Sequence, residues 1–227
     1  MKTKNSVIIV AAGKGSRMSG DTKKQFLKLG GKLVLNYSLE FFDKCHFLEE
    51  IILVVAKEDI EYCRELVSGY NKISKIVVGG NTRQESVFNG LKYLDKDTDI
   101  VVVHDAARPF INFLDLEKLL DAAKHYGSSA FGVLVKDTIK LKNSDMEVTK
   151  TLNRDELVSI QTPQAFLYDK FFKVHKIASE NCYCGTDDTV LMERCGFKTK
   201  IVYGSYYNIK ITTDEDLVIA DAINRVV

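Results

Sequence analysis

The 227-residue sequence lacks any strong excess of charge, and this excludes several classes of function. Its 32 basic and 31 acidic residues leave a formal net charge of +1. Proteins that bind nucleic acids or anionic membranes broadly carry a basic surplus, which this chain does not have. We therefore expect no nucleic-acid partner and no membrane association, and any basic site must be local.

Long apolar runs and paired cysteines are missing as well. No stretch approaches the roughly 18 apolar residues of a membrane-spanning helix. The basic start, MKTKNS, leads into a short apolar run over residues 7–12 with no signal-peptide pattern. The five cysteines have no metal-binding spacing, since Cys182 and Cys184 form a C-x-C without a second pair. These features predict a cytoplasmic protein with reduced thiols.

What the sequence has instead is an alternation of short apolar runs with helical patterns. Strands are expected at residues 7–11, 51–55, 75–78, 100–103 and 130–135, and helices at 59–67, 82–94 and 116–123. Such an order predicts an α/β fold, with a mostly parallel, Rossmann-like sheet flanked by helices in a single domain over residues 1–227. Ligands of these folds bind at the edge where the parallel strands end.

The first expected strand ends in a glycine loop that reads AAGKGSRM. Gly13 and Gly15 expose backbone N–H groups, and Arg17 and Lys24 add positive charge, a combination that suits a triphosphate. The loop is not a Walker A motif, and Met18 stands where the dinucleotide-binding fingerprint needs its third glycine. A plain turn is the alternative interpretation.

Two more clusters follow expected strands. In GGNTRQES, residues 79–86, a glycine turn precedes a helix start with Asn81 or Thr82 as N-cap. Polar or anionic ligand groups can bind at such a helix start. An ordinary strand-to-helix turn is the alternative interpretation. In HDAARP, residues 104–109, Asp105 is well placed to hold Mg²⁺ near phosphates, or it forms an ion pair with an arginine that shapes the turn. His104 fits a packed, hydrogen-bonded histidine better than a ligand or base.

Near the C-terminus, Lys210 lies in a strand-like run, NIKITT, just before an expected helix. Thr213 and Asp216 have the spacing of a capping box, which is structural. Lys210 is either a site residue or a solvated lysine. The segments QTPQ, residues 161–164, and TDD, residues 186–188, complete the clusters at expected strand ends.

Residues 136–160 alternate polar with apolar side chains around a turn signal at 143–145, which predicts a two-stranded hairpin with little core face. An isolated hairpin is marginally stable, so this one should pack on something, and a second subunit is the natural candidate. A surface flap is the alternative.

Taken in order, the motifs AAGKGSRM, KQF, GGNTRQESV, HDAARPF, KDT, QTPQAF, TDD and NIKIT resemble the 2-C-methyl-D-erythritol 4-phosphate cytidylyltransferase family of non-mevalonate isoprenoid biosynthesis. The resemblance extends over nearly the whole chain. It implies a nucleotidyltransferase fold with residues 136–160 as the dimerisation arm of a homodimer. It also implies CTP and a sugar-alcohol phosphate as ligands, Mg²⁺ as cofactor and pyrophosphate as a product.

Matched motif by motif, the resemblance also implies the roles of individual residues. The catalytic set is Arg17, Lys24, Asp105 and Lys210, with Asp105 also the metal ligand. The nucleotide-binding set is Ala11, Ala12, Gly13, Gly15, Gly80, Asn81, Arg83, Ser86 and Ala106. The set that binds the sugar phosphate is Arg108, Thr138, Arg154 and Thr186, with Thr138 and Arg154 supplied by the partner's arm.

The chain departs from the family pattern at two places. Lys23 stands where proline is common, which bears on the rigidity of the glycine loop, and Asp188 with Thr189 replaces the more usual Glu-Ala. Neither change removes a reacting group. A phosphate nucleophile is already ionised at pH 7, so the implied reaction needs no general base.

Two rival functions remain at the level of sequence. A cytidylyltransferase for ribitol or ribulose 5-phosphate shares most motifs, but its cluster tends to read HDSVRP, so Ala106 and Ala107 favour methylerythritol phosphate. A non-catalytic nucleotide-binding regulator on the same fold would have lost charged site residues, whereas Arg17, Lys24 and Lys210 are present.

Overall fold

The computed structural model describes residues 3–13 and 23–227, and its main feature is a seven-stranded sheet of order β11-β7-β10-β6-β1-β4-β5. The strands are β1 (Asn5–Ala11), β4 (Glu50–Val55), β5 (Ile73–Val78), β6 (Ile100–Asp105), β7 (Ser128–Leu134), β10 (Val158–Leu167) and β11 (Lys200–Tyr203). Of these seven, β10 alone pairs antiparallel with both neighbours. The sheet is therefore mostly parallel, which confirms the predicted fold class.

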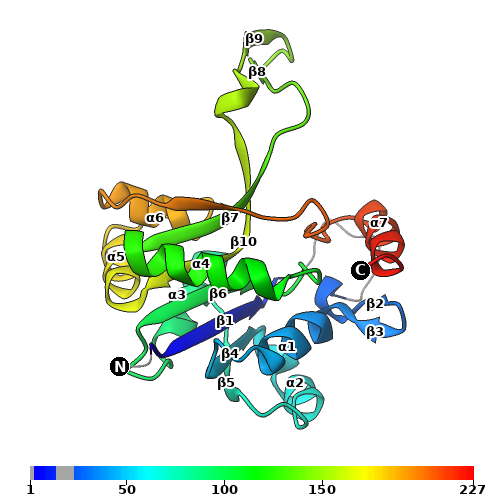
Figure 1. Cartoon of the computed structure of the whole chain (residues 1–227), viewed down its shortest axis with the longest axis vertical. Coiled ribbons are helices and arrows are strands. Elements are labelled where there is room, and N and C mark those ends of the chain that lie inside the picture. The colour runs from blue at the N-terminus through cyan, green and yellow to red at the C-terminus, as the bar shows by residue number, and fades with distance from the viewer. Residues whose placement is uncertain (1–2, 14–22) are drawn as a thin grey trace.

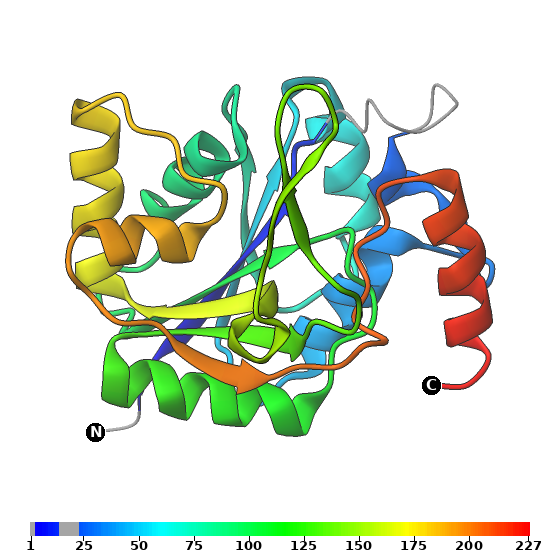
Figure 2. The same ribbon diagram turned by 90° about the horizontal axis from the view of Figure 1, so that it is seen from above.

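Helices cover both faces of the sheet (Figures 1 and 2). One face carries α1 (Val34–Lys44), α2 (Ile60–Leu66) and α4 (Phe113–Tyr126), and the other carries α3 (Arg83–Leu91), α5 (Tyr168–Glu180) and α6 (Asp188–Arg194). Side chains alternate along β1, so Val7 and Ile9 enter one core while Ile8 enters the other, and all three are fully buried. Burial on both faces explains why the central strands are continuously apolar.

Smaller elements surround the sheet. They are the 3₁₀ turns η1 (Lys24–Phe26) and η2 (Lys57–Asp59), the short hairpin β2 (Lys28–Leu29) and β3 (Lys32–Leu33), and the C-terminal helix α7 (Asp214–Asn224). Helix α7 packs on that hairpin through a small core that includes Leu29 and Ala220. Thr213 and Asp216 form the expected capping box at its start. None of the helices in the described ranges is long and apolar enough to cross a membrane.

A hairpin arm projects from the sheet between β7 and β10, at the top of Figure 1. It consists of β8 (Lys140–Lys142) paired antiparallel with β9 (Val148–Thr151), followed by the 3₁₀ turn η3 (Arg154–Glu156). The predicted hairpin is confirmed, but it is shorter than residues 136–160, because the chain joins the main sheet as β10 from Val158 onward.

Two strands of the seven-stranded sheet escaped the sequence analysis, and one predicted strand-like run is irregular. Strand β10 carries the polar QTPQ segment and has a register shift between Gln161 and Gln164, which obscures its pattern. Strand β11 has four residues at the edge of the sheet. The NIKITT run lies outside the sheet; the N–H of Ile211 donates to the carbonyl of Ala107 instead.

The close packing of α3 on the sheet gives a test of the fold. A Cβ atom added at Gly90 would lie 2.8 Å from Ile8 Cγ2 and 3.1 Å from Val54 Cγ2. We expect Gly90→Ala to lower the free energy of unfolding by about 1–2 kcal/mol, because overpacking outweighs the gain in helix propensity. Urea denaturation measures this. Gly69→Ala, where an added Cβ meets open space, is the control and should change stability little; an unchanged or more stable Gly90→Ala would contradict the packing argument.

Candidate active site

The first wall of the candidate site is the end of β1, where Ala11, Ala12 and Gly13 line a cavity of about 400 Å³. Gln25 holds this strand end: its side-chain amide donates to the carbonyl of Ala11 at 2.7 Å, and Gln25 is only 2% exposed. Lys24 lines the same cavity. Gly15 and Arg17, both predicted for this wall, lie outside the described residues.

Lys23 replaces a common proline, yet it is firmly held. Its ammonium group lies 2.7 Å from both Glu58 Oε1 and Asp59 Oδ2 in the loop after β4, and its side chain is 19% exposed. Both acidic residues belong to η2, so two tertiary ion pairs restrain the start of η1.

The second wall is the turn between β5 and α3. Thr82 is the N-cap of α3, and the N–H of Gly80 donates to Ser86 Oγ at 3.0 Å. A Cβ at Gly79 would lie 2.5 Å from Ala12 Cβ, so glycine is required for this turn to approach the end of β1. The approach brings Gly80, Asn81, Arg83 and Ser86 to the same cavity as the glycine-loop residues.

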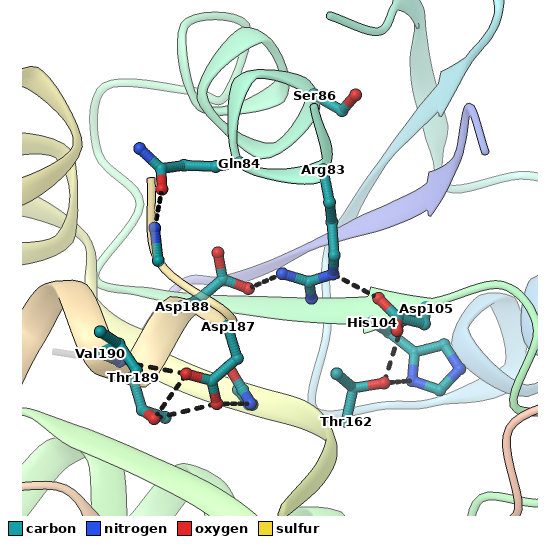
Figure 3. Close-up of polar contacts among 12 residues, drawn as sticks. Arg83, Gln84, Ser86, His104, Asp105, Thr162, Asp187, Asp188, Thr189 and Val190 are labelled. Atoms are coloured by element: carbon teal, nitrogen blue, oxygen red, sulfur yellow. Dashed lines mark hydrogen bonds and ion pairs between the residues drawn. The ribbon is translucent and has the colours of Figure 1, made fainter. Parts of the chain in front are cut away.

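The third wall is Asp105 at the end of β6. Arg83 Nε donates to Asp105 Oδ1 at 2.8 Å, and Lys210 Nζ donates to Oδ2 at 2.5 Å (Figure 3 shows the pair with Arg83). Burial opposes ionisation of this carboxyl, but the two cations outweigh it and hold the Asp105 pKa far below its usual range. Asp105 is therefore a carboxylate near neutral pH.

These pairs decide between the interpretations of two motifs. The aspartate does not pair with the arginine of its own turn: Arg108 Nη1 donates to the carbonyl of Asn208 at 2.7 Å instead. Lys210 is one of the partners of Asp105 and is 33% exposed, so the solvated-lysine interpretation is wrong.

His104 is the packed histidine that the sequence favoured. It is fully buried, Nε2 donates to the carbonyl of Arg108 at 3.0 Å, and Thr162 Oγ1 lies 3.3 Å from Nδ1. Burial lowers its pKa to about 3, so the ring is neutral near pH 7 and serves to fix the turn that presents Asp105.

A second cavity, of about 460 Å³, adjoins the first and shares Arg83, Asp105 and Lys210 with it. Arg108 and Thr186, predicted for the sugar phosphate, line this cavity. Arg108 Nε and Arg83 Nη2 are buried and find no hydrogen-bond acceptor within the described ranges. The guanidinium groups of Arg83 and Arg108 at this cavity are suited to an anion such as phosphate.

Within a single chain, neither Thr138 nor Arg154 lines either of the two cavities. Both are exposed on the arm, where Arg154 Nη1 donates to the carbonyl of Lys136 at 2.9 Å. Their predicted place in a site therefore requires a second subunit.

The residues present could hold Mg²⁺ only if the substrate supplied some of its ligands. Over residues 3–13 and 23–227, no group of three or more histidine, cysteine or acidic side chains is arranged to hold a metal ion. Mg²⁺ often binds through one or two carboxylates together with substrate phosphates, and Asp105 is the carboxylate that lines the nucleotide-sized cavity. Because both of its oxygens accept from cations, a metal ion would share or displace one of those hydrogen bonds.

The sequence analysis gave no role to Gln164 and Asp187, which line the second cavity, or to the buried Asp188 that follows Asp187. Gln164 donates to Asp187 Oδ2 at 2.9 Å, which ties β10 to the start of α6. Asp188 pairs with Arg83 at 2.6 Å (Figure 3). The QTPQ and TDD motifs marked these segments, but the partner of each side chain is distant in sequence and gave no local signal.

Comparison with known proteins identifies the family. The profile of the 2-C-methyl-D-erythritol 4-phosphate cytidylyltransferase family (IspD) matches residues 6–225. The chain belongs to this family. A Caldanaerobacter subterraneus protein of that name is 47% identical over 97% of this chain and 98% of its own length, and a Clostridium botulinum one is 45% identical over 97% of each.

Solved structures agree with this family assignment. The structure of 4-diphosphocytidyl-2C-methyl-D-erythritol synthase from Anaerococcus prevotii has a TM-score of 0.89 at 35% identity, covering 99% of this chain and 97% of its own. The Francisella tularensis family member has a TM-score of 0.83 at 32% identity, covering 97% and 100%.

The charge cluster around Asp105 makes a prediction about stability. Asp105→Asn removes the anionic partner of Lys210 and leaves Arg83 with Asp188, and we expect a loss of about 2 kcal/mol at pH 7, below the roughly 3–5 kcal/mol of a fully buried pair because both cations are partly exposed.

The pH dependence of that loss follows from the depressed pKa of Asp105. The stabilisation is complete above the ordinary pKa of about 4 and is lost as the pH falls toward the folded pKa. The deficit of Asp105→Asn should thus be equal at pH 7 and pH 5 and should shrink at pH 3 and below, measured by urea denaturation of both proteins. A deficit that grows with acid would show that the carboxylate is not stabilised by these cations.

Proposed function

We propose that the protein joins CTP and 2-C-methyl-D-erythritol 4-phosphate, giving 4-diphosphocytidyl-2-C-methyl-D-erythritol and pyrophosphate. The observation that carries the proposal is the pair of adjoining cavities that share Arg83, Asp105 and Lys210. The first is lined by Ala11, Ala12 and Gly13 at the start of the glycine motif and by the start of α3, which suit a nucleoside triphosphate. The second holds guanidinium groups, which suit a sugar phosphate. Family membership supplies the identity of both substrates.

The reaction is a displacement at phosphorus. A phosphate oxygen of the sugar phosphate attacks the α-phosphorus of CTP, and the bond from that phosphorus to the pyrophosphate oxygen breaks. Both reactants are polyanions, so their repulsion opposes the encounter. We assign Lys24, Lys210 and Arg17 to neutralising this charge and stabilising the transition state. Lys210 lies where the two cavities meet, which supports its role between the two substrates.

No protein base is needed for this step, because the attacking phosphate is ionised at neutral pH. The buried, neutral His104 agrees with this, since it serves the turn rather than a substrate. Further neutralisation of the triphosphate is the chemistry that Mg²⁺ supplies when it is bound, and we propose Asp105 as its protein ligand.

The buried alanine pair favours methylerythritol phosphate over ribitol or ribulose 5-phosphate. Ala106 and Ala107, 1% and 3% exposed, occupy the positions where the rival motif tends to read Ser-Val. The close relatives also carry the methylerythritol phosphate name.

We further propose a homodimer that pairs through the arm. The arm exposes apolar side chains, with Met146 72% exposed and Val148 61% exposed, as expected of a surface that a partner covers. It also carries Thr138 and Arg154, which we assign to the partner's sugar-phosphate pocket. A cytoplasmic location is the last part of the proposal, and it is supported by five cysteines that are all unpaired.

Pyrophosphate release tests the proposed reaction. With CTP and Mg²⁺, we expect kcat/KM for 2-C-methyl-D-erythritol 4-phosphate to exceed that for ribitol 5-phosphate by on the order of 10² or more, because the pocket must reject a differently shaped polyol. ATP, GTP and UTP in place of CTP are the nucleotide controls. An equal or reversed preference between the sugar phosphates would overturn the substrate assignment.

Mixed dimers test the shared site. Lys24→Ala and Arg154→Ala homodimers should each be nearly inactive. In a mixed dimer, one site contains both defects and the other contains neither, so each mixed dimer has one active site. Random 1:1 assortment makes about half of the dimers mixed, and activity should recover to roughly a quarter of wild type. If mixed dimers form but activity does not recover, the arm serves the site of its own chain.

A further inference from the structure

Asp188 has no assigned role in the reaction, yet it is one of the most deeply buried charges of the chain. It lies in the first turn of α6 and is 1% exposed. Arg83 Nη1 donates to its Oδ2 at 2.6 Å (Figure 3). Its other oxygen, Oδ1, is 3.7 Å from His175 Nε2, which is too long for a hydrogen bond. Arg83 is therefore the hydrogen-bond donor to this buried carboxylate, and His175 is a more distant neighbour.

Arg83 is in turn held by two carboxylates from different elements. Nε donates to Asp105 at the end of β6, and Nη1 donates to Asp188 on α6 (Figure 3). A guanidinium group is planar and rigid, so two hydrogen bonds at separate nitrogens fix its plane as well as its position. Asp188 supplies one of those two restraints.

The position of Arg83 matters because it forms part of the boundary between the cavities. Arg83 lines both of them, as does Asp105. Along this boundary the charges alternate from Asp188 to Arg83, Asp105 and Lys210. Without the charge of Asp188, Arg83 and Lys210 would share a single carboxylate, and the guanidinium would be free to move away from its present plane.

We propose that Asp188 is a positioning residue of the transfer reaction, which holds Arg83 against Asp105 and so sets the geometry of the boundary between the nucleotide and sugar-phosphate pockets. The inference rests on the proposed function. The proposal also bears on position 188, where the chain departs from the family pattern. Aspartate keeps the carboxylate of the more usual glutamate, with a side chain shorter by one methylene.

The primary test is Asp188→Asn, which preserves size and removes the charge. With saturating CTP and 2-C-methyl-D-erythritol 4-phosphate, kcat should fall about 10- to 100-fold, the scale of a misplacement of roughly an ångström, while KM for CTP changes less than about threefold. Assays are run well below the Tm of the variant, so that loss of folded protein does not enter kcat. Unchanged kcat would overturn the inference.

A double-mutant cycle separates positioning from a merely structural role. In an Arg83→Ala background, Asp188 has no guanidinium to hold, so Asp188→Asn should lower kcat less than about twofold further. The same fold loss in both backgrounds would overturn the inference. Should Asp188→Asn not fold, Asp188→Ser also removes the charge, and its kcat loss should likewise vanish in the Arg83→Ala background; an unchanged kcat for Asp188→Ser would overturn the inference.

The controls keep this inference distinct from the proposed function. Asp115→Asn removes another first-turn aspartate, on α4, and should leave kcat unchanged. If the wild-type enzyme releases no pyrophosphate from these substrates, the proposed function fails. If it does and Asp188→Asn is fully active, only the role of Asp188 fails.

Discussion

The ionised carboxylate of Asp105 is the constraint on which the site depends. It lies at the end of a buried strand, where an isolated negative charge would be strongly unfavourable. Arg83 from α3 and Lys210 from the C-terminal segment neutralise it, at 2.8 Å and 2.5 Å. Each cation comes from a different part of the chain. The ion pairs that neutralise Asp105 therefore also bring together the walls of the nucleotide and sugar-phosphate pockets.

The second requirement of the site is that neighbouring backbone segments approach each other closely, which glycine residues allow. The turn before α3 can reach the end of β1 because Gly79 leaves room for Ala12, and α3 itself lies near the sheet because Gly90 leaves room for Ile8. Gln25 then ties η1 back to Ala11. The nucleotide pocket is thus shaped by backbone positions, and the charged side chains act within that frame.

The arm explains why a single chain holds an incomplete set of the predicted residues. Its hairpin leaves the sheet between β7 and β10 (Figure 1). Thr138 and Arg154 belong to this arm and line neither of the two cavities. Such a hairpin has little core of its own, and a partner subunit would give it one. Under the proposed function, dimerisation and substrate binding are therefore linked through the same segment.

Local patterns in the sequence indicated the α/β fold, the strand ends that carry the site, a helix cap at Asn81 or Thr82, the capping box at Thr213 and the packed state of His104. These features depend on periodicity and on interactions within a few residues, which a sequence displays directly. Only the tertiary structure decided that β10 runs antiparallel. It also decided that Asp105 pairs with Arg83 and Lys210, which are 22 and 105 positions away, and not with its neighbour Arg108. It alone also paired Asp188 with Arg83. Such partners are selected by burial and charge after the chain has folded, and no local pattern records them.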